Sequence, residues 1–472
     1  MNKIIAISGS SGVGKTTISR LISIALPNEK ALIFSGDDLH KWERGDSNWD
    51  TYTHLNPEAN NLLLGYEHLK TLKSNDKIVH CSYDHNTGKF GPSINIYPAK
   101  FIVYEGLHAL YDVRVRDMSW IKIFIDTAED LKREWKIQRD TKKRGYTKEQ
   151  VEDTLKRRRD DERKHIDTQR KYADVIIRFK KNKDGKVVLT YDIINSNAEE
   201  LMEVLSVAYE KHFSFIDVCN SLSSEFDLVQ SRGGNVSYKI NDKLIITSSG
   251  SRMKEINIFG GHCICNVHLL SSYFDNDDIY RSKLWKSKLF ESNERPSMET
   301  GMHYNLEKNV IHTHPIYLNT ILCSKEAEQI LGVLFGSLDY EFVSYSTPGV
   351  DLSNAIGSYR QAPIYFLENH GLVVCDVDIH NAYETTKYIS DKCKSWLMNN
   401  ATNFKFKFNG NIEEGDEYLF PDAIALSDEN LAMNTYMIEL MNDVGLTPKY
   451  LMKKEIEKIQ NMESEKYRSQ LV

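Results

Sequence analysis

The stretch Gly9-Ser10-Ser11-Gly12-Val13-Gly14-Lys15-Thr16 follows the apolar run Ile4-Ile5-Ala6-Ile7 and precedes a helix-like spacing of apolar residues. It has the spacing G-x-x-x-x-G-K-[ST] of a phosphate-binding loop between a strand and a helix. Its glycines let successive backbone N–H groups surround phosphate oxygens, and the helix N-terminus adds partial positive charge. The stretch therefore predicts a nucleoside triphosphate site, with the Thr16 hydroxyl on Mg²⁺. The expected ATP contacts are Gly9, Gly12, Gly14, Lys15, Thr16 and Thr17.

The length and composition of the chain limit its class. At roughly 100–200 residues per domain, 472 residues predict two or three domains. A net charge of -7 argues against a general nucleic-acid or membrane-surface binder. No apolar run reaches the roughly 20 residues that span a bilayer, and the chain starts directly with a strand rather than a signal peptide, so we expect a cytoplasmic protein. The seven scattered cysteines form no disulfide framework, and Cys263 and Cys265 are expected to be buried thiols on one face of a strand.

Acidic residues follow two further apolar strands in the first 180 residues. The run Ala31–Phe34 leads to Asp37 and Asp38, and the run Phe101–Tyr104 leads to Glu105. Open α/β sheets bind ligands at the carboxyl ends of parallel strands. A kinase needs a carboxylate there to orient, and in some cases deprotonate, the attacking hydroxyl. Glu105 has the position of a Walker B acid, whereas an acidic pair in a turn is by itself common.

A highly charged helical region follows the predicted strand Ile121–Ile125. The run Arg157-Arg158-Arg159 is typical of a solvated helix face, but it could also belong to a lid that brings guanidinium groups onto the transferred phosphate. Arg139 and Arg144 are better candidates for that role, because they follow a strand end, where a lid would hinge.

Residues 1 to about 180 resemble the phosphoribulokinase and uridine kinase family, and within it phosphoribulokinase. The motifs GDDLH, LNPEANN, YDHNTG, YEGLHALYD, WKIQRD, RGYT and TQRKYADVII occur in the expected order. The resemblance implies phosphorylation of a sugar or sugar-phosphate hydroxyl, with Asp37 as the catalytic base and Glu105 as the acid on the metal side. Arg139 keeps the catalytic role that its position after a strand end suggests. Aromatic residues that would clamp a nucleoside base are not identifiable, which makes uridine the weaker acceptor. The expected substrate contacts are His40, Arg44, Tyr83, His85 and Arg144.

Three histidines in the second half of the chain suggest a metal site. His312 and His314 lie two apart on a predicted strand, so their side chains share a face and can converge on one ion. His370 follows the apolar strand Ile364–Leu367. Three histidines leave an open coordination position, which catalytic zinc requires and structural zinc does not. A His-x-His pair alone is also common without a metal.

Groups that suit a phosphorylated substrate occur in the same half. The turns Ser231–Asn235 and Thr247–Gly250 are rich in glycine and hydroxyl groups, and they can bind a phosphate through N–H and Oγ donors. Glu299 supplies a carboxylate that can move protons. Zinc beside a phosphate pocket and a carboxylate fits C–C cleavage next to a ketone, because the cation stabilises the negative charge that develops.

Residues 213–398 resemble the class II aldolase/adducin group, which includes L-fuculose-1-phosphate aldolase and L-ribulose-5-phosphate 4-epimerase. The motifs GGNVS, TSSG, RPSMET, HTHP, SYSTPG and ENHGLVV occur in that group's order. The resemblance implies Zn²⁺ on His312, His314 and His370. It also implies that Glu299 is the acid/base, able to touch zinc itself, and that Tyr345 is a proton donor contributed across a subunit interface.

The same resemblance implies phosphate contacts and bears on the reaction. Glu at position 299 is similar to the aldolases, whereas the epimerases tend to carry Asp. Met298 stands where the pattern usually has a second serine, which weakens one phosphate contact. The implied phosphate contacts are Asn235, Ser249, Gly250 and Ser297.

These observations predict an α/β chain of four parts. A P-loop sugar kinase domain with a parallel sheet and flanking helices is expected at 1–195, and a connecting helix at 196–212. A zinc-dependent aldolase-like domain with a central, mainly antiparallel sheet is expected at 213–398. A helical extension follows at 399–472, in which no chemistry is readable.

The expected function is that of a bifunctional enzyme, an ATP- and Mg²⁺-dependent ketose kinase fused to a Zn²⁺-dependent aldolase. A pentulose-5-phosphate 4-epimerase and a non-catalytic, adducin-like oligomerisation module are the alternatives for the second half. Retention of three histidines and Glu299 counts against the non-catalytic module. The expected partners are a small sugar or sugar phosphate and further copies of the chain, most simply as a tetramer, with no nucleic acid and no membrane.

Overall fold

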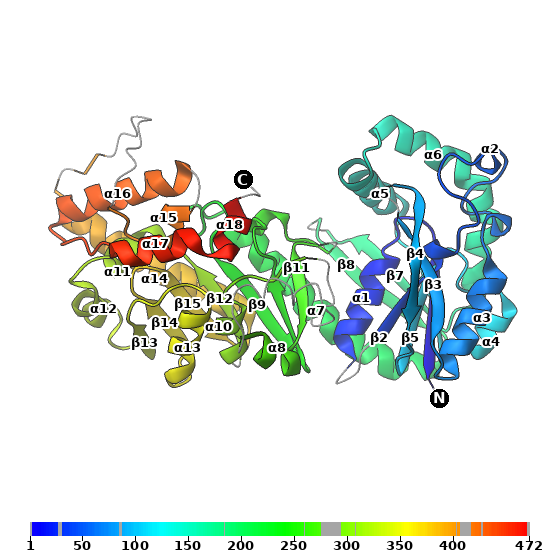
Figure 1. Cartoon of the computed structure of the whole chain (residues 1–472), viewed down its shortest axis with the longest axis horizontal. Helices are drawn as coiled ribbons and strands as arrows, with labels where there is room; N and C mark the ends of the chain where they lie inside the picture. The colour runs from blue at the N-terminus through cyan, green and yellow to red at the C-terminus, as the bar shows by residue number, and fades with distance from the viewer. Residues whose placement is uncertain are drawn as a thin grey trace. The chain divides into compact units, whose positions relative to one another are not determined.

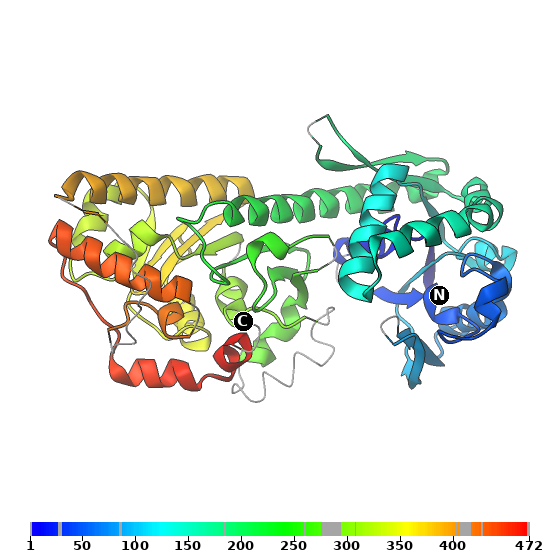
Figure 2. The ribbon, with the colours of Figure 1, turned by 90° about the horizontal axis from the view of Figure 1, so that it is seen from above.

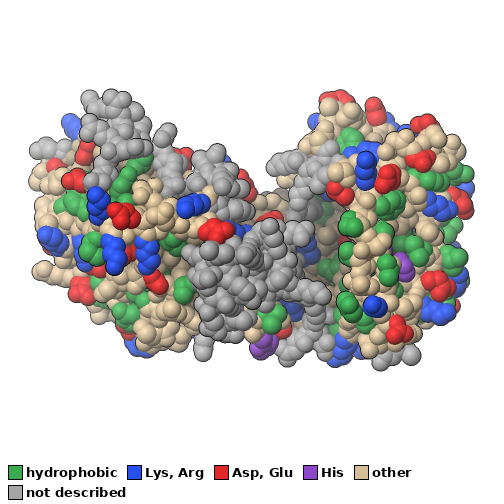
Figure 3. Space-filling model, in the orientation of Figure 1, with side chains coloured by type: hydrophobic (Ala, Val, Ile, Leu, Met, Phe, Trp, Pro, Cys, Tyr) green, Lys and Arg blue, Asp and Glu red, His purple; other side chains and the backbone are tan. Residues whose placement is uncertain are grey.

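The computed structural model describes residues 2–26, 31–84, 87–183, 185–258, 260–274, 294–306, 308–402, 404–405, 417–425 and 428–469. Only the backbone is described at 142–144, 271–274, 425, 428 and 467–469. The chain divides into two compact units, Met1–Tyr209 and Glu210–Val472. Among the described helices, none combines the length and the apolar character that a bilayer crossing requires. On the face drawn in Figure 3, acidic and basic side chains are interspersed.

The first unit is built on a six-stranded sheet (Figure 1). In spatial order its strands are β2 (Ala31–Ser35), β5 (Phe101–Gly106), β1 (Lys3–Gly9), β6 (Ile121–Ile125), β7 (Val175–Lys181) and β8 (Val187–Ile193). All neighbours pair in parallel except β7 and β8, which are antiparallel. β1 is buried along its length except at Lys3, as expected for a central strand that is covered on both faces.

Helices pack on this sheet and bury a core that includes Ile4, Phe34, Leu69 and Ile102. A separate antiparallel hairpin consists of β3 (Ile78–Asp84) and β4 (Lys89–Ile96). The helices are α1 (Lys15–Ala25), α2 (Asn48–Thr51), α3 (Leu62–Lys73), α4 (Val113–Met118), α5 (Glu129–Arg144) and α6 (Lys148–Asp161), with short helical turns η1 (Gly36–Leu39), η2 (Pro57–Ala59), η3 (Glu162–Ile166), η4 (Asp167–Tyr172) and η5 (Ser196–Ala198).

The boundary between the units lies within helix α7 (Glu199–Ser223). This helix continues well past the predicted connecting segment at 196–212. The reason is that its apolar spacing continues, with Phe215, Val218 and Leu222 all buried. The last turns of α7 therefore belong to the core of the second unit.

The second unit contains a seven-stranded sheet. In spatial order its strands are β11 (His262–Asn266), β10 (Lys243–Thr247), β9 (Asn235–Ile240), β12 (Asn309–Thr313), β15 (Gly371–Asp376), β14 (Ile364–Leu367) and β13 (Tyr340–Val343). Every neighbouring pair is antiparallel except β13 and β14. The mostly parallel first sheet and the mainly antiparallel second sheet confirm the predicted fold class. Cys263 and Cys265 are both buried in β11, as predicted.

Helix α14 (Ile379–Asn400) packs on β12 and β15 and against α11 (Ile316–Leu322), so it covers one face of the sheet (Figure 2). The C-terminal extension forms α15 (Pro421–Ala425), α16 (Asp428–Val444), α17 (Lys453–Asn461) and α18 (Glu463–Ser469), drawn in orange and red in Figure 1. The remaining helices of the second unit are α8 (Val267–Phe274), α10 (Thr300–Asn305), α12 (Ala327–Phe335) and α13 (Val350–Ser358), with the short turn η6 (Met253–Glu255).

Candidate functional site

The loop between β1 and α1 has the backbone conformation that a phosphate-binding loop needs. Gly12 and Gly14 adopt φ values of 87° and 97°, in the left-handed region that favours glycine. A Cβ on Gly14 would lie 2.9 Å from the Phe179 ring, so there is no room for a side chain. The Lys15 Nζ donates to the carbonyl of Gly9 at 3.0 Å, which keeps its ammonium group at the loop. Burial lowers the pKa of Lys15, although nearby carboxylates oppose the shift.

Carboxylates converge on this loop from two neighbouring strands. The Thr16 Oγ1 lies 3.1 and 3.2 Å from the carboxylate oxygens of Glu105, the residue that ends β5 with Gly106. Burial raises the pKa of Glu105, and the charge of Lys15 opposes that shift. The parallel pairing of β2 with β5 brings the turn carrying Asp37 beside Glu105. The loop, Lys15, Thr16 and both predicted acids therefore meet at the carboxyl edge of the sheet. Thr17, the remaining predicted contact, is buried in α1.

The two adjacent acids of the GDDLH motif differ in their contacts. Asp38 Oδ1 accepts the backbone N–H of Tyr83 at 2.7 Å, and its Oδ2 lies 3.2 Å from His80 Nε2. Asp38 thus fastens the hairpin strand β3 to the end of β2. Asp37 instead contributes negative charge at Lys15 and Glu105. This division is consistent with the choice of Asp37 as the base, which stays a prediction.

The predicted acceptor residues lie among aromatic rings. The centroid of the His40 ring lies 4.7 Å from that of His54, 5.8 Å from that of Trp49 and 5.1 Å from that of Tyr83. Trp49 and His54 belong to none of the sequence motifs, and their place in this ring cluster was not predicted. The backbone N–H of Arg44 donates to the Gly88 carbonyl at 2.8 Å, so Arg44 lies beside the turn of the YDHNTG motif. His85 lies outside the described residues, as does the Arg144 side chain.

Cationic side chains of α5 reach the phosphate-binding loop. Arg139 Nη2 lies 3.3 Å from Ser11 Oγ, and Lys136 Nζ lies 3.4 Å from the same atom. Asp140 holds both cations, at 2.8 Å from Arg139 Nε and 2.9 Å from Lys136 Nζ. Burial opposes ionisation of Asp140, but these two cations outweigh it and hold the pKa of Asp140 at about 2. The position of Arg139 fits its predicted role, and Lys136 is a contact that the sequence did not reveal.

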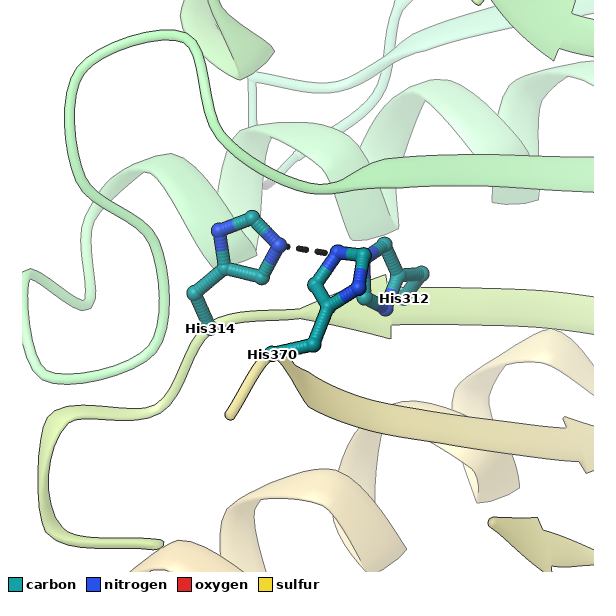
Figure 4. A group of neighbouring side chains, drawn as sticks. All are labelled: His312, His314 and His370. Atoms are coloured by element: carbon teal, nitrogen blue, oxygen red, sulfur yellow. Dashed lines mark hydrogen bonds between the residues drawn. The ribbon is translucent and has the colours of Figure 1, made fainter. Parts of the chain in front are cut away.

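The three predicted histidine ligands converge in the second unit (Figure 4). His312 is the second-to-last residue of β12, His314 directly follows that strand, and His370 lies in the turn before β15. All three are buried, and one ring nitrogen from each lies within 4.8 Å of the others. The Nε2 atoms of His312 and His314 are 3.0 Å apart. Ligand atoms of a tetrahedral zinc with Zn–N bonds of about 2.0–2.1 Å lie about 3.3 Å apart, close to the separation of these two Nε2 atoms.

The other ring nitrogens are consistent with metal binding. His312 Nδ1 donates to the Leu372 carbonyl at 2.9 Å, which leaves the Nε2 lone pair for a ligand. Burial lowers the pKa of His312 to about 3, so this imidazole is neutral at neutral pH. His370 Nδ1 is buried and has no hydrogen-bond partner within the described part of the chain. A buried nitrogen without a partner is costly unless a bound group satisfies it.

Glu299 lies against the histidines, as predicted. One of its oxygens is 3.0 Å from His370 Nε2, and the other is 3.4 Å from His312 Nε2. The Asn235 amide donates to Glu299 at 2.6 Å and to Ser297 Oγ at 3.2 Å. The Asn235 amide hydrogens therefore orient the Glu299 carboxylate, whereas the contact of Asn235 with a phosphate stays a prediction.

His303 extends this network and was not predicted. Its Nε2 bonds to the Asn235 carbonyl oxygen, and its Nδ1 lies 2.7 Å from Ser237 Oγ. Burial lowers the pKa of His303 to about 3, so the ring is neutral. His303 lies in α10, outside any motif, and only its fully buried position marks it as part of the site.

A pocket that is partly open to solvent lies beside the cluster. Its walls bring together the four predicted phosphate contacts, Glu299 and two of the histidines. Arg232, Asp422 and Glu465 also line it and were not predicted, the last two because they belong to the C-terminal extension. These lining residues are Asn235, Ser249, Gly250, Ser297, Glu299, His314, His370, Arg232, Asp422 and Glu465.

Tyr345 does not lie on the wall of this pocket. It packs against the apolar cluster of Leu451, Ile456 and Ile459 at α17. Its hydroxyl is buried without a hydrogen bond to any described residue, and burial raises the pKa of Tyr345. Within one chain, therefore, the C-terminal extension covers Tyr345. Its role as a proton donor across a subunit interface stays a prediction.

The comparisons with known proteins separate the two units. Residues 4–185 match the phosphoribulokinase / uridine kinase family, and residues 214–397 match the class II aldolase and adducin N-terminal domain. A phosphoribulokinase from Synechocystis is 37% identical over 207 residues, which are 44% of this chain and 60% of that protein. A uridine kinase from Borrelia turicatae is 36% identical over 186 residues, 38% of this chain and 86% of that protein.

Among solved structures, the N-terminal class II aldolase domain of a conserved protein from Thermoplasma acidophilum is 22% identical with a TM-score of 0.35, over 39% of this chain and 92% of that one. The chain spans about half to 60% of the length of the curated phosphoribulokinases it matches, 60% of the Synechocystis protein and 48% of the chloroplastic protein from Spinacia oleracea. Through its first unit the chain belongs to the phosphoribulokinase / uridine kinase family, and its second unit carries a class II aldolase and adducin domain.

Proposed function

We propose that this chain is a bifunctional enzyme that phosphorylates a ketose, or ketose phosphate, with ATP and cleaves a ketose phosphate by metal-dependent aldol chemistry. The observation that carries the proposal is the pocket in which Glu299, buried histidines and the two glycine- and serine-rich turns meet. A pocket for binding alone would not require a buried carboxylate beside the histidines.

In the kinase unit, each part of phosphoryl transfer has a candidate group. The loop N–H groups and Lys15 bind the phosphates of ATP, and Thr16 with Glu105 would hold Mg²⁺. Asp37 accepts the proton of the acceptor hydroxyl. Arg139 lies at Ser11 of the loop, where its charge can stabilise the transferred phosphoryl group.

In the aldolase unit, His312, His314 and His370 would hold Zn²⁺, which when bound polarises the substrate carbonyl. Glu299 gives or takes a proton through a carboxylate oriented by the Asn235 amide. Ser249, Gly250 and Ser297 bind the substrate phosphate, and Arg232 on the same wall adds a positive charge. Glu at position 299 favours cleavage over epimerisation.

The two activities fit one another chemically. A kinase that acts at the C1 hydroxyl of a ketose makes the kind of ketose 1-phosphate that an aldolase splits into dihydroxyacetone phosphate and an aldehyde. Fusion raises the local concentration of the intermediate. We also propose a cytoplasmic homo-oligomer, with a tetramer formed through the second unit as the simplest form.

Two separate assays test the proposal on the full chain. The first follows ADP release with Mg²⁺-ATP and a panel of pentuloses, hexuloses and their phosphates. The second omits ATP, supplies Zn²⁺ with ketose 1-phosphates or with pentulose 5-phosphates, and detects substrate conversion and any released triose phosphate and aldehyde. No ADP release on any acceptor would overturn the kinase assignment. Conversion of a pentulose 5-phosphate without free fragments would indicate an epimerase, and no conversion by metal-loaded protein would indicate a non-catalytic module.

A further inference from the structure

We propose that Asp422, in the C-terminal extension, is a positioning residue for the metal ligand His314, and that the extension is thus a working part of the metal site. The proposal rests on the metal-dependent function proposed above. Asp422 lies in α15, beyond residues 214–397 that match the aldolase domain, in a segment whose sequence shows no chemistry.

The contact between the two side chains is direct. Asp422 Oδ2 lies 3.0 Å from His314 Nδ1. Both residues are only 6% exposed. A carboxylate in this position accepts the Nδ1 proton, so the Nε2 lone pair of His314 is free for a metal and faces His312 Nε2 at 3.0 Å. A carboxylate behind a ligand histidine also fixes the ring orientation and raises the basicity of the ligand atom.

The three histidines differ in the hydrogen-bond partner of Nδ1. His312 Nδ1 is held by a backbone carbonyl, that of Leu372. His370 Nδ1 makes no hydrogen bond to the described residues. Within the described part of the chain, His314 is the ligand whose Nδ1 has a carboxylate partner. Removal of that charge should therefore affect metal binding through His314 specifically.

The C-terminal extension makes direct hydrogen bonds to the turn that carries His370. The Asn369 amide, next to ligand His370, donates to the carbonyls of Leu419 at 2.7 Å and Lys449 at 2.6 Å. Leu419 and Phe420, which lead into α15, are 0% and 1% exposed. These contacts fix the start of α15 beside the turn that carries His370, and thereby place the Asp422 carboxylate.

The glycine-rich turn that contains Gly233 packs closely against the Asp422 and His314 side chains. A Cβ built on Gly233 would lie 2.9 Å from Asp422 Oδ2 and 2.9 Å from His314 Nδ1. A methyl group there would be forced against both atoms of the contact. Gly233→Ala therefore disturbs the contact without removing the carboxylate, and it offers a second variant for the test.

The experiment measures binding of Zn²⁺ and Co²⁺ to the metal-free full-length protein by competition with a chelator. We expect Asp422→Asn to weaken Zn²⁺ binding by about 10–100-fold, as loss of a partner behind a ligand histidine typically does. The visible absorption bands of bound Co²⁺ should shift as well, because the ring orientation changes. The matched control is Asp443→Asn in α16, whose carboxylate bonds to the backbone N–H of Thr402 at 2.8 Å. It should change neither affinity nor spectrum.

Each outcome decides the proposal. Equal Zn²⁺ affinity and an unchanged Co²⁺ spectrum for Asp422→Asn and the control would overturn it while leaving the proposed function intact. Wild-type protein that binds no metal would instead overturn the proposed function itself. If Asp422→Asn does not fold without metal, as judged by circular dichroism, Gly233→Ala gives the answer, and an unchanged affinity and spectrum in that variant would overturn the proposal.

Discussion

Replacement of Asp38 and of Asp37 by Asn, one at a time, separates a structural carboxylate from its catalytic neighbour. Asp38 accepts the Tyr83 N–H at 2.7 Å and lies 3.2 Å from His80 Nε2, and its side chain is 17% exposed. An amide in its place can accept one hydrogen bond but turns an NH₂ group toward the other donor. We therefore expect Asp38→Asn to loosen the attachment of β3 and to destabilise the first unit.

The magnitude follows from the contacts that are lost. A hydrogen bond to a charged group contributes about 1.5–3 kcal/mol, so Asp38→Asn should cost about 2–3 kcal/mol. In a unit of this size, that cost lowers Tm by about 4–12 °C. Asp37→Asn should change stability by less than about 0.5 kcal/mol. It should instead slow phosphoryl transfer by about 10²–10⁴-fold, the usual contribution of a general base.

Calorimetry of the full chain measures both stability effects. ATP identifies the transition of the first unit, because a ligand of the folded state raises that Tm. ADP release with an active ketose from the acceptor panel gives kcat. The reasoning is refuted if Asp38→Asn abolishes turnover at unchanged Tm, or if Asp37→Asn keeps wild-type kcat.

Three further results are expected. Lys15→Ala should abolish ATP turnover and leave metal content unchanged, whereas His312→Ala should lower metal content and leave ATP turnover unchanged. ADP release measures turnover and elemental analysis measures metal content. Loss of both properties in either variant would contradict independent sites. Glu299→Gln should lower the rate of ketose phosphate cleavage by about 10²–10⁴-fold while most of the metal is retained, and a loss of metal as large as the loss of rate would contradict its role in proton transfer. The pKa of His303 is about 3 in the folded chain, below the unfolded value. The unfolded state therefore binds more protons between about pH 3 and 6.5, so the free energy of unfolding decreases as the pH is lowered through that range, by up to about 1.4 kcal/mol per pH unit. In denaturant unfolding of the metal-free protein, the free energy of unfolding should depend less steeply on pH in His303→Gln than in the wild type. Equal slopes in the two proteins would contradict this contribution of His303.

Residues within local motifs were placed well by the sequence alone. The glycine spacing and Lys15 fix the phosphate-binding loop, because the motif encodes backbone conformation directly. The two-residue spacing of His312 and His314 correctly predicted that the two rings lie together, although His314 lies just past the end of β12. The pairing of β12 with β15 then brings His370 beside them.

Residues that act through distant contacts were missed. Asp422 contacts His314, and His303 contacts Asn235, through the tertiary fold, and no local period encodes such contacts. The sequence also could not assign different roles to Asp37 and Asp38, since the difference comes from the hairpin strand β3. Trp49 and His54 join the rings around His40 by packing that only the folded chain shows.

The central claim is that two chemistries act in sequence on one substrate. Its most direct test is a time course of the purified full chain with ATP, Mg²⁺, Zn²⁺ and the active ketose, in which ADP and product masses are followed together. We predict that a species heavier by one phosphoryl group appears first and then splits into a triose phosphate and an aldehyde. Accumulation of an unsplit phosphorylated ketose by metal-loaded protein would contradict the account.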